Sequence, residues 1–434
     1  MKILRTLPWP GLILGGILLI YQLATLRDIP FHPDESSWLH MSKDFEVFVT
    51  QPGAMAWNPA EEGNPDQTNR EIGAPVTKYI LGFARWASRL PPPETDWDWT
   101  KNWQENQKAG ALPDDHTLWL GRLAITLLLP FSLILIYISG EFIGGRTTGL
   151  TAALLLGTHT LVLLHDRRAM AEGALTMGVA LSIWGIIRAG RHPWLSGLGI
   201  ALAYNAKQSS LALLLAGLLT VCYLPKESRK GPGQVGSNLV QYLGVFALLT
   251  FALNPLLWHN PWQATRASWT ARQELLQRQM AAFTQVHPEQ VLHTFTQRAA
   301  VLLANLYITQ PSASEVSNYH ADTAITTADY ISNPLHNLMR GYLGGGILLT
   351  LSLFGFILAG RKSLNPATPN RQALLGLLFA TLVQTAALIA MVPLPFQRYA
   401  IPLVPFTCLW CAYGVNQVFL IGRLYMSRKG SYAN

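Results

Sequence analysis

Charged residues are scarce in this chain. Only 13% of its 434 residues are Asp, Glu, Lys or Arg, whereas 50% are hydrophobic, and the mean hydropathy is positive. A soluble globular domain normally carries roughly a quarter charged residues. The composition therefore excludes an ordinary soluble protein and predicts a chain that crosses a membrane many times.

Cysteine is scarce as well. The three cysteines, Cys222, Cys408 and Cys411, lie in or beside apolar runs, and none lies in a segment that we expect outside the membrane. Disulfide bonds across an outer surface are therefore excluded, and the sequence shows no zinc-finger spacing of cysteine and histidine. An extracellular disulfide scaffold and a zinc-finger protein can both be set aside.

Long apolar runs are abundant. Runs near the ~20 residues that cross a bilayer recur along the chain. They are Leu7–Leu26, Leu118–Ser139, Thr148–Leu164, Glu172–Ile187, Ser196–Leu224, Leu239–Trp258, Tyr342–Gly360, Ala373–Val392 and Tyr399–Ile421. Positive charges at both ends of Ser196–Leu224 predict two short helices there, which meet near Asn205-Ala206-Lys207-Gln208. The predicted fold is therefore an all-α polytopic transmembrane bundle with about ten crossings.

The net charge of +8 could indicate a nucleic-acid partner, but its distribution indicates membrane orientation. If the N-terminus is cytoplasmic, the inside segments hold fourteen Lys and Arg, among them Lys226, Arg229 and Lys230, against only Glu141 and Glu227. Short cytoplasmic loops are enriched in Lys and Arg. We expect both termini in the cytoplasm, Met1–Thr25 as a retained anchor, and no nucleic-acid partner.

Two external segments are long, 27–116 and 259–340, and the chain is predicted to form one transmembrane domain over 1–434. Long connections in a compact protein usually carry function. We expect helices lying on the membrane surface at Trp97–Trp103, Ala271–Met280 and Val291–Ile308. The inside loop is expected at Lys226–Ser237, and no large C-terminal soluble domain is expected.

Asp34 and Glu35 follow the first apolar run, in the phrase His32-Pro33-Asp34-Glu35. One interpretation is a helix N-cap at Asp34, with a helix that begins at Glu35. The other is a carboxylate that takes a proton from an acceptor hydroxyl, which requires hydrogen-bond distance to that hydroxyl. One of the two carboxylates can cap while the other reacts.

Several cations fall on the same predicted outer face, each with polar neighbours. They are Lys78 with Glu71 nearby, Arg167 and Arg168 before Glu172, Lys207 with Gln208, and Arg398. Internal salt bridges to Asp166 or Glu172 would explain the arginine pair, and contact with lipid headgroups would explain the others. Together, however, carboxylates and cations from separate segments suit the displacement of a lipid phosphate, since cations stabilise charge on the departing oxygen.

These residues resemble the motifs of the membrane-embedded GT-C glycosyltransferases, in particular the protein O-mannosyltransferase and aminoarabinose-transferase-like group, glycosyltransferase family 39. Asp34-Glu35 resembles the acidic pair of the first external loop. The other matching phrases are Pro75-Val76-Thr77-Lys78-Tyr79 with Glu71, Arg168-Ala169-Met170-Ala171-Glu172, Ala206-Lys207-Gln208-Ser209 and Gln397-Arg398-Tyr399. Gly73-Ala74-Pro75 departs from the His-Pro-Pro that the family often has ahead of Lys78.

The resemblance implies an enzyme of cell-envelope glycosylation that inverts the sugar. It implies transfer of a hexose or pentose from a polyprenyl-phosphate donor to a lipid, glycan or protein hydroxyl at the outer face of a bacterial inner membrane. Asp34 would be the general base, Glu35 a catalytic partner, and Lys78, Lys207 and an arginine would hold the phosphate. His32, Asp34 and Glu35 could belong to a metal site, but no second ligand cluster accompanies them, so no metal or other cofactor is predicted.

Two other classes remain open from the residues alone. A transporter or flippase of lipid-linked saccharides would show matching broken helices in two halves with polar residues near the membrane midplane. The sequence has one predicted break, and its polar residues gather at one face. A non-catalytic membrane scaffold would not need the acidic pair at Asp34 and Glu35.

Overall fold

The computed structural model describes residues 8–223, 232–316 and 319–431, and within these ranges it contains helices and no strand. The chain is an all-α, multi-pass membrane protein. The helices of the bundle are α2 (Trp9–Ala24), α8 (Asp115–Thr126), α9 (Leu129–Gly144), α10 (Arg146–Gly157), α11 (Thr160–His165), α12 (Ala171–Arg188), α13 (Pro193–Ala206), α14 (Leu213–Tyr223), α15 (Pro232–Leu253), α19 (Gly341–Leu364), α20 (Arg371–Met391) and α21 (Val404–Ser431).

The two long external segments supply the remaining helices. They are α3 (Pro33–Met41), α4 (Asp44–Thr50), α5 (Pro65–Ile72), α6 (Pro75–Ala87) and α7 (Trp103–Lys108) from the first segment, and α16 (Pro261–Val286), α17 (Phe295–Tyr307) and α18 (His320–Ser332) from the second. Short 3-10 turns connect them, among them η1 (Leu26–Asp28), η2 (Pro52–Met55), η3 (Pro59–Glu61), η5 (Pro255–Leu257), η6 (Pro288–Gln290) and η8 (Pro334–Asn337).

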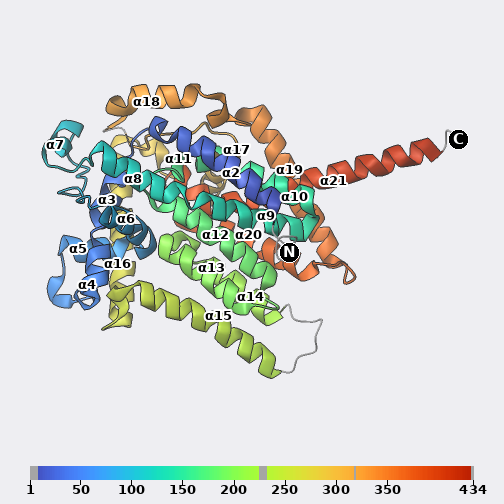
Figure 1. Ribbon diagram of the computed structural model, residues 1–434, viewed down its shortest axis with the longest axis horizontal. Coiled ribbons are helices and arrows are strands. Elements are labelled where there is room, and N and C mark those ends of the chain that lie inside the picture. Colours follow the sequence, from blue (N-terminus) through green and yellow to red (C-terminus); the bar gives the residue numbers. More distant parts are fainter. Residues whose placement is uncertain (1–7, 224–231, 317–318, 432–434) are drawn as a thin grey trace.

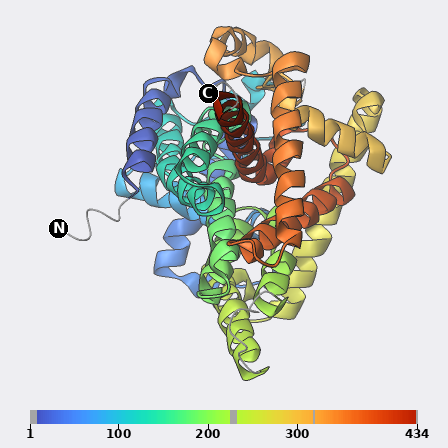
Figure 2. The same cartoon turned by 90° about the vertical axis from the view of Figure 1, so that its right-hand side faces the viewer.

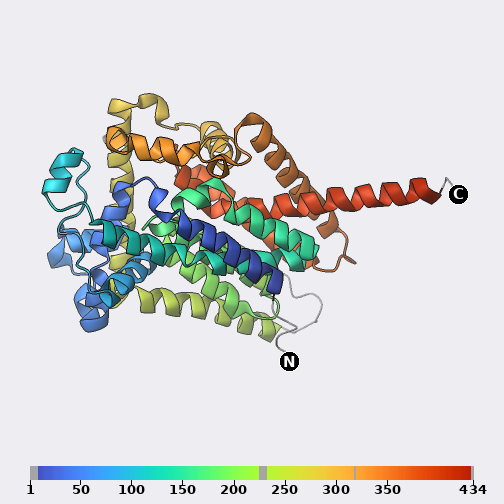
Figure 3. The same ribbon diagram turned by 45° about the horizontal axis from the view of Figure 1, so that its top comes forward.

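The helices of the first external segment gather at one end of the bundle. Figure 1 shows α3 to α7 at the left end, while α2 begins and α21 leaves the bundle at the opposite end. Figure 3 shows the same separation from a second direction. Five helices among the described residues are long and apolar enough to cross a membrane, and α2 and the 208–222 segment are shorter apolar helices. The polar external helices therefore cover one end of an apolar bundle.

Helix α12 lies at the centre of the bundle, with α2 on one side and α19 on the other (Figure 2). Almost all of its residues are buried, and it packs most extensively on α13. Gly178 lies against Ala203 and Gly185 against Ser196, so that the two backbones approach closely. Small residues permit such close packing of membrane helices. This contact fixes Glu172, at the start of α12, next to the end of α13.

Two predicted spans are interrupted. The run Leu118–Ser139 is divided between α8 and α9, where Pro130 begins the second helix without a backbone donor. The run Thr148–Leu164 is divided between α10 and α11, because the His159 side chain accepts a hydrogen bond from the Leu161 N–H and caps a new helix. The span predicted at Leu118–Ser139 is nevertheless confirmed, because the α8–α9 segment Asp115–Gly144 is long and apolar enough to cross a membrane, whereas Thr148–Leu164 forms two shorter helices.

The predicted break near Asn205 is confirmed. Helix α13 ends at Ala206, Lys207 is extended at φ −158° and ψ 127°, and the turn η4 (Gln208–Ser210) leads into α14. Asn205 donates to Ala201 O and to Thr250 Oγ1, which satisfies part of the polar backbone at the break. Irregular backbone inside a bundle needs such internal partners.

Three expectations about the external and inside segments need correction. Residues Trp97 to Asn102 form turns, and Trp97 is buried against Phe31 and Trp103, because the indoles pack on one another. Ala271–Met280 is helical as predicted, within the longer α16, but the helix predicted from Val291 starts only at Phe295, as α17, after a capping box from Thr294. Residues 232–237 of the expected inside loop belong to α15; Lys226, Arg229 and Lys230 lie outside the described residues.

Candidate active site at one end of the bundle

The acidic pair lies in the first turn of α3. The N-cap is His32 and the helix begins at Pro33, so the predicted cap at Asp34 is wrong. His32 Nδ1 accepts a hydrogen bond from the Asp34 N–H at 3.1 Å, and Glu35 accepts one from the His32 N–H at 3.0 Å. The His32 and Glu35 side chains thus pair with backbone N–H groups at the start of the helix. The Asp34 carboxylate can therefore interact with groups outside the helix.

Glu35 is completely buried and fully hydrogen-bonded. Arg122 donates to both of its oxygens through Nε and Nη2, each at 2.8 Å. The Ala169 N–H donates at 3.0 Å, in addition to the bond from His32. Burial raises the pKa of Glu35, but Arg122 outweighs burial and holds the pKa below the usual value. This geometry favours a positioning role for Glu35, and its predicted catalytic role remains a prediction.

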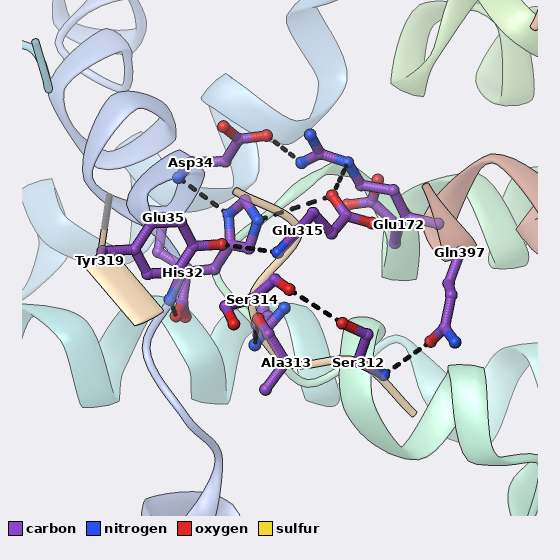
Figure 4. A network of polar contacts seen from close by, with 12 residues as sticks. His32, Asp34, Glu35, Glu172, Ser312, Ala313, Ser314, Glu315, Tyr319 and Gln397 are labelled. Atoms are coloured by element: carbon purple, nitrogen blue, oxygen red, sulfur yellow. Dashed lines mark hydrogen bonds and ion pairs between the residues drawn. The ribbon is translucent and has the colours of Figure 1, made fainter. Parts of the chain in front are cut away.

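Arg398 pairs with two carboxylates, those of Asp34 and Glu315, both of which are labelled in Figure 4. Its Nη1 donates to Asp34 Oδ2, and its Nε lies 2.9 Å from Glu315 Oε2 as an ion pair. The Asp34 side chain keeps 24% of its surface exposed, whereas Glu315 keeps 3% and Glu35 none. Asp34 is therefore the carboxylate of this network that an incoming molecule can reach.

The charges around Asp34 set its protonation state. Burial raises the pKa of Asp34, but the Arg398 guanidinium outweighs burial, and the net pKa lies below the usual value. For Glu315, burial likewise raises the pKa and Arg398 brings it well below its ordinary range. Both groups are therefore carboxylates at neutral pH, and Asp34 can accept a proton.

His32 and Tyr319 hold Glu315 in place. Burial lowers the pKa of His32, so that its imidazole is neutral at pH 7. Because Nδ1 accepts the Asp34 N–H, the proton is on Nε2, which lies 3.7 Å from Glu315 Oε2. The Tyr319 hydroxyl accepts the Glu315 N–H at 3.1 Å, and its ring packs edge-on against His32. The segment that carries Glu315 and the start of α3 therefore meet around Arg398.

The arginine pair after α11 makes backbone contacts. Arg168 donates to Pro30 O, at the start of the first external segment, and to Ala313 O in the second. It therefore links the two segments. Arg167 donates to Thr25 Oγ1 at 2.6 Å and lies over the Tyr330 ring. Neither forms an ion pair with Asp166 or Glu172 in the described structure, which rules out the predicted internal salt bridges.

Lys207, at the break between α13 and α14, joins the same network from the opposite side. Its Nζ donates to Glu172 Oε1 at 2.6 Å and lies 5.5 Å from the centre of the Tyr399 ring. Arg272 of α16 donates to Gln208 Oε1 at 2.9 Å. Lys207, Arg272 and Arg398 therefore converge on the ring of Tyr399, next to Asp34.

Lys78 and Glu71 lie in a different polar cluster. Lys78 is buried and donates to Asp44 Oδ2 at 3.1 Å and to Asn69 O at 2.9 Å, while Arg70 binds the other Asp44 oxygen. Glu71 accepts from the Trp57 indole at 3.0 Å. The contacts of these two residues do not include Asp34 or Arg398. Substrate binding by Lys78 and Glu71 remains a prediction.

Several buried polar atoms beside Asp34 have no hydrogen-bond partner within the described residues. They are His32 Nε2, His165 Nδ1 and Nε2, Arg168 Nη1, Glu172 Oε2 and Glu315 Oε1. Buried polar groups are normally paired, so unpaired ones call for a ligand or water. No group of three or more His, Cys, Asp or Glu is placed to hold a metal in the described ranges, and Asp34 and Glu35 are already taken up by arginines. That the reaction needs no metal remains a prediction.

The sequence interpretation missed Glu315 and Arg272. Glu315 is the sole acid between Glu289 and Asp322 in the chain. Such an isolated acid in a polar segment is a weak signal, which gains meaning only once Arg398 is placed beside it. Arg272 falls in a predicted surface helix, where a cation facing water is the ordinary expectation.

Comparisons with known proteins place this arrangement in a structural class. The sequence matches no protein-family model and no curated protein. The fold resembles the Archaeoglobus fulgidus oligosaccharyltransferase, solved in complex with Zn and sulfate, with a TM-score of 0.51 and 11% identity over 97% of this chain and 51% of that chain. The same oligosaccharyltransferase, AglB, has been solved with an inhibitory peptide and a dolichol-phosphate, again with a TM-score of 0.51.

Two further solved structures match at TM-scores below 0.5. ArnT from Cupriavidus metallidurans, bound to undecaprenyl phosphate, matches at a TM-score of 0.46 and 12% identity over 93% of this chain and 59% of that one. The Saccharomyces cerevisiae Pmt1–Pmt2 O-mannosyltransferase, bound to the sugar donor, matches at 0.40 and 14% identity over 59% and 34%. The chain spans about half the length of the oligosaccharyltransferase. It has the fold of the GT-C glycosyltransferases.

Proposed function

We propose that this protein is a glycosyltransferase that moves a hexose or pentose from a polyprenyl-phosphate donor to an acceptor hydroxyl of a lipid, glycan or protein. The observation that carries the proposal is the accessible carboxylate of Asp34, held on Arg398 at one end of the bundle. A general base must lie within hydrogen-bond reach of the proton it removes. Of the carboxylates in this network, Asp34 meets that condition best.

The proposed reaction is a single displacement. The acceptor oxygen attacks the anomeric carbon while Asp34 takes the hydroxyl proton. The bond between that carbon and the phosphate oxygen breaks, and polyprenyl phosphate leaves with the electron pair. Because Glu35 and Glu315 are almost completely buried, neither can reach the sugar to form a glycosyl–enzyme bond, and the more exposed Asp34 acts as a base. One such displacement inverts the anomeric configuration.

Donor binding would also activate the base. A phosphate forms stronger, paired hydrogen bonds with a guanidinium than a single carboxylate oxygen does. When the donor phosphate binds Arg398, Asp34 loses the cation that lowers its pKa, and the pKa rises because burial remains. A base whose pKa lies near the operating pH transfers protons more effectively. Sugar transfer would thus require the donor to bind before the acceptor is deprotonated.

The other cations would stabilise the leaving phosphate. Lys207 and Arg272 lie with Arg398 around Tyr399, and each has a neutralising or polar partner that a phosphate could replace. Cations positioned where negative charge develops in the transition state often make the largest single contribution to catalysis. Glu172 and Gln208 would orient these cations. Lys78 remains a candidate second contact to the phosphate, and Arg167 and Arg168 would hold the loops that close the site.

The setting supports a lipid-linked donor. The site lies at one end of an apolar bundle, and the oligosaccharyltransferase of similar fold has been solved with a dolichol-phosphate. We place the site on the extracytoplasmic face of a bacterial inner membrane, with both termini in the cytoplasm. One domain over 1–434 would carry the whole reaction, without a metal or other cofactor.

The test reconstitutes the purified chain in liposomes with polyprenyl-phosphate hexoses or pentoses carrying a radioactive sugar. An envelope extract supplies acceptors on the same side. We expect the radioactive sugar to become water-soluble or bound to an acceptor, and polyprenyl phosphate to be released. A flippase of lipid-linked saccharides would move the intact donor between leaflets without breaking the sugar–phosphate bond, and that result would contradict the proposal.

A further inference from the structure

A cavity apart from the Asp34 network lies between membrane helices. It is partly open to the surface and is bordered by the α10–α11 junction, α17, α19 and α21. Most of its wall is apolar and includes Leu155, Leu306, Leu348 and Cys408. None of the residues assigned above to the reaction lines it.

One cation lies in this wall. Arg340 precedes α19, and its Nε donates to Thr160 Oγ1 while its Nη1 donates to Asn305 O at 2.9 Å. Its Nη2 is buried and has no partner among the described residues. Burial lowers the pKa of Arg340 to about 10, which is still well above neutral pH, so the guanidinium stays charged.

The cation has no described counter-ion. Its two partners are a hydroxyl and a backbone carbonyl, and the groups that act on its pKa besides burial are Cys408 and Tyr307. A buried charge is costly unless an opposite charge or further hydrogen bonds compensate. An anion bound at Nη2 would supply both. The ligand that completes this site therefore carries negative charge.

The location identifies the rest of that ligand. Arg340 stands immediately before a helix long and apolar enough to span a membrane, so it marks the membrane–water boundary. Below it, the cavity wall is apolar, and on the outer side of α19 Leu343 and Ile347 are exposed, as expected of residues in contact with lipid. Basic pockets between membrane helices bind phosphate headgroups of lipids. The chemistry required is an anionic headgroup joined to a hydrocarbon chain.

We propose that this cavity binds a phosphate-bearing lipid, with the phosphate on Arg340 and the chain along α19 and α21. The site is separate from the proposed sugar-transfer centre, so its failure would leave that proposal unaffected. Two sources supply this chemistry, a bilayer phospholipid and a polyprenyl phosphate. The experiment below separates them.

The test is native mass spectrometry of the full chain, delipidated in detergent and titrated with phosphatidylglycerol, with diacylglycerol of the same chains, or with polyprenyl phosphate. We expect phosphatidylglycerol or polyprenyl phosphate to bind at least about tenfold more tightly than diacylglycerol, as one charge-assisted hydrogen bond would provide. The phosphate lipid with the higher affinity for the Arg340 site is its source. Equal binding of diacylglycerol and both phosphate lipids would overturn the proposal.

Two pairs of variants locate the site. Arg340→Gln should abolish the preference for phosphate, whereas Arg361→Gln, at the exposed far end of the same helix, should keep it. Arg340→Gln also removes two internal hydrogen bonds, so a second variant is needed. Leu348→Trp fills the cavity and leaves the guanidinium intact. Leu348→Trp should lose the lipid, and Ile347→Trp, on the lipid-facing side, should retain it. Lipid binding unchanged in both Arg340→Gln and Leu348→Trp would refute the site.

Discussion

Glu35→Gln should destabilise the protein strongly, because the substitution breaks a buried ion pair. Glu35 has no exposed surface and accepts four hydrogen bonds, two of them from Arg122. Glutamine has the same shape but presents a donor where one of the acceptor oxygens was, and it leaves Arg122 without a counter-charge. Removing one partner of a buried pair costs about 3–5 kcal/mol.

The measurement is the thermal unfolding midpoint of the detergent-solubilised protein. A loss of that size should lower the midpoint by roughly 5 °C or more. Lys101→Gln is the matched control, because Lys101 pairs with Asp98 at the exposed surface, where an ion pair contributes at most about 1 kcal/mol. Its midpoint should stay close to that of the unsubstituted protein.

A double-mutant cycle completes the test. Arg122→Gln added to Glu35→Gln should cost much less than Arg122→Gln alone, since the pair is already broken. The reasoning would be refuted by a Glu35→Gln protein that is as stable as the parent and yet inactive. That result would return Glu35 to the catalytic role that the sequence suggested.

Three further substitutions probe the charges around Asp34 through sugar transfer. Arg398→Gln should lower kcat/KM at least about tenfold and move the acidic limb of the pH–rate profile to higher pH, because burial then controls the pKa of Asp34; a limb that stays in place would contradict this. Glu315→Gln should move that limb to lower pH, since the negative charge of Glu315 raises the pKa of Asp34; a shift to higher pH would count against it. Lys207→Gln should raise KM for the donor about tenfold, in a kinetic assay with Lys101→Gln as control; an unchanged KM would remove Lys207 from the phosphate site.

The sequence predicted those features that depend on local pattern. Apolar runs of bilayer length predicted the membrane bundle. Positive charge at both ends of Ser196–Leu224 predicted the helix break in which Lys207 lies. The orientation of short loops also placed Asp34 and Arg398 on one face. These inferences needed no knowledge of which helices are neighbours.

The contacts within the site could not be predicted from the sequence. Asp34 and Arg398 are 364 positions apart, and their pairing depends on how η9 (Gln397–Leu403) packs beside α3. Aspartate is a preferred N-cap and histidine is not. The sequence therefore predicts the cap at Asp34, whereas the structure has it at His32. Glu315 carries only a weak local signal, because its importance comes from its ion pair with Arg398, which a distant segment supplies. Short-range patterns do not encode such tertiary pairings.

The proton-accepting role of Asp34 is tested most directly by Asp34→Asn in a single-turnover assay of sugar transfer from a saturating polyprenyl-phosphate donor. Asparagine keeps the shape but cannot take the acceptor proton. We predict a rate about 10²- to 10⁴-fold lower, the usual contribution of a general base, with donor still bound. A rate within about threefold of that of the unsubstituted protein, at equal donor occupancy, would contradict the assignment.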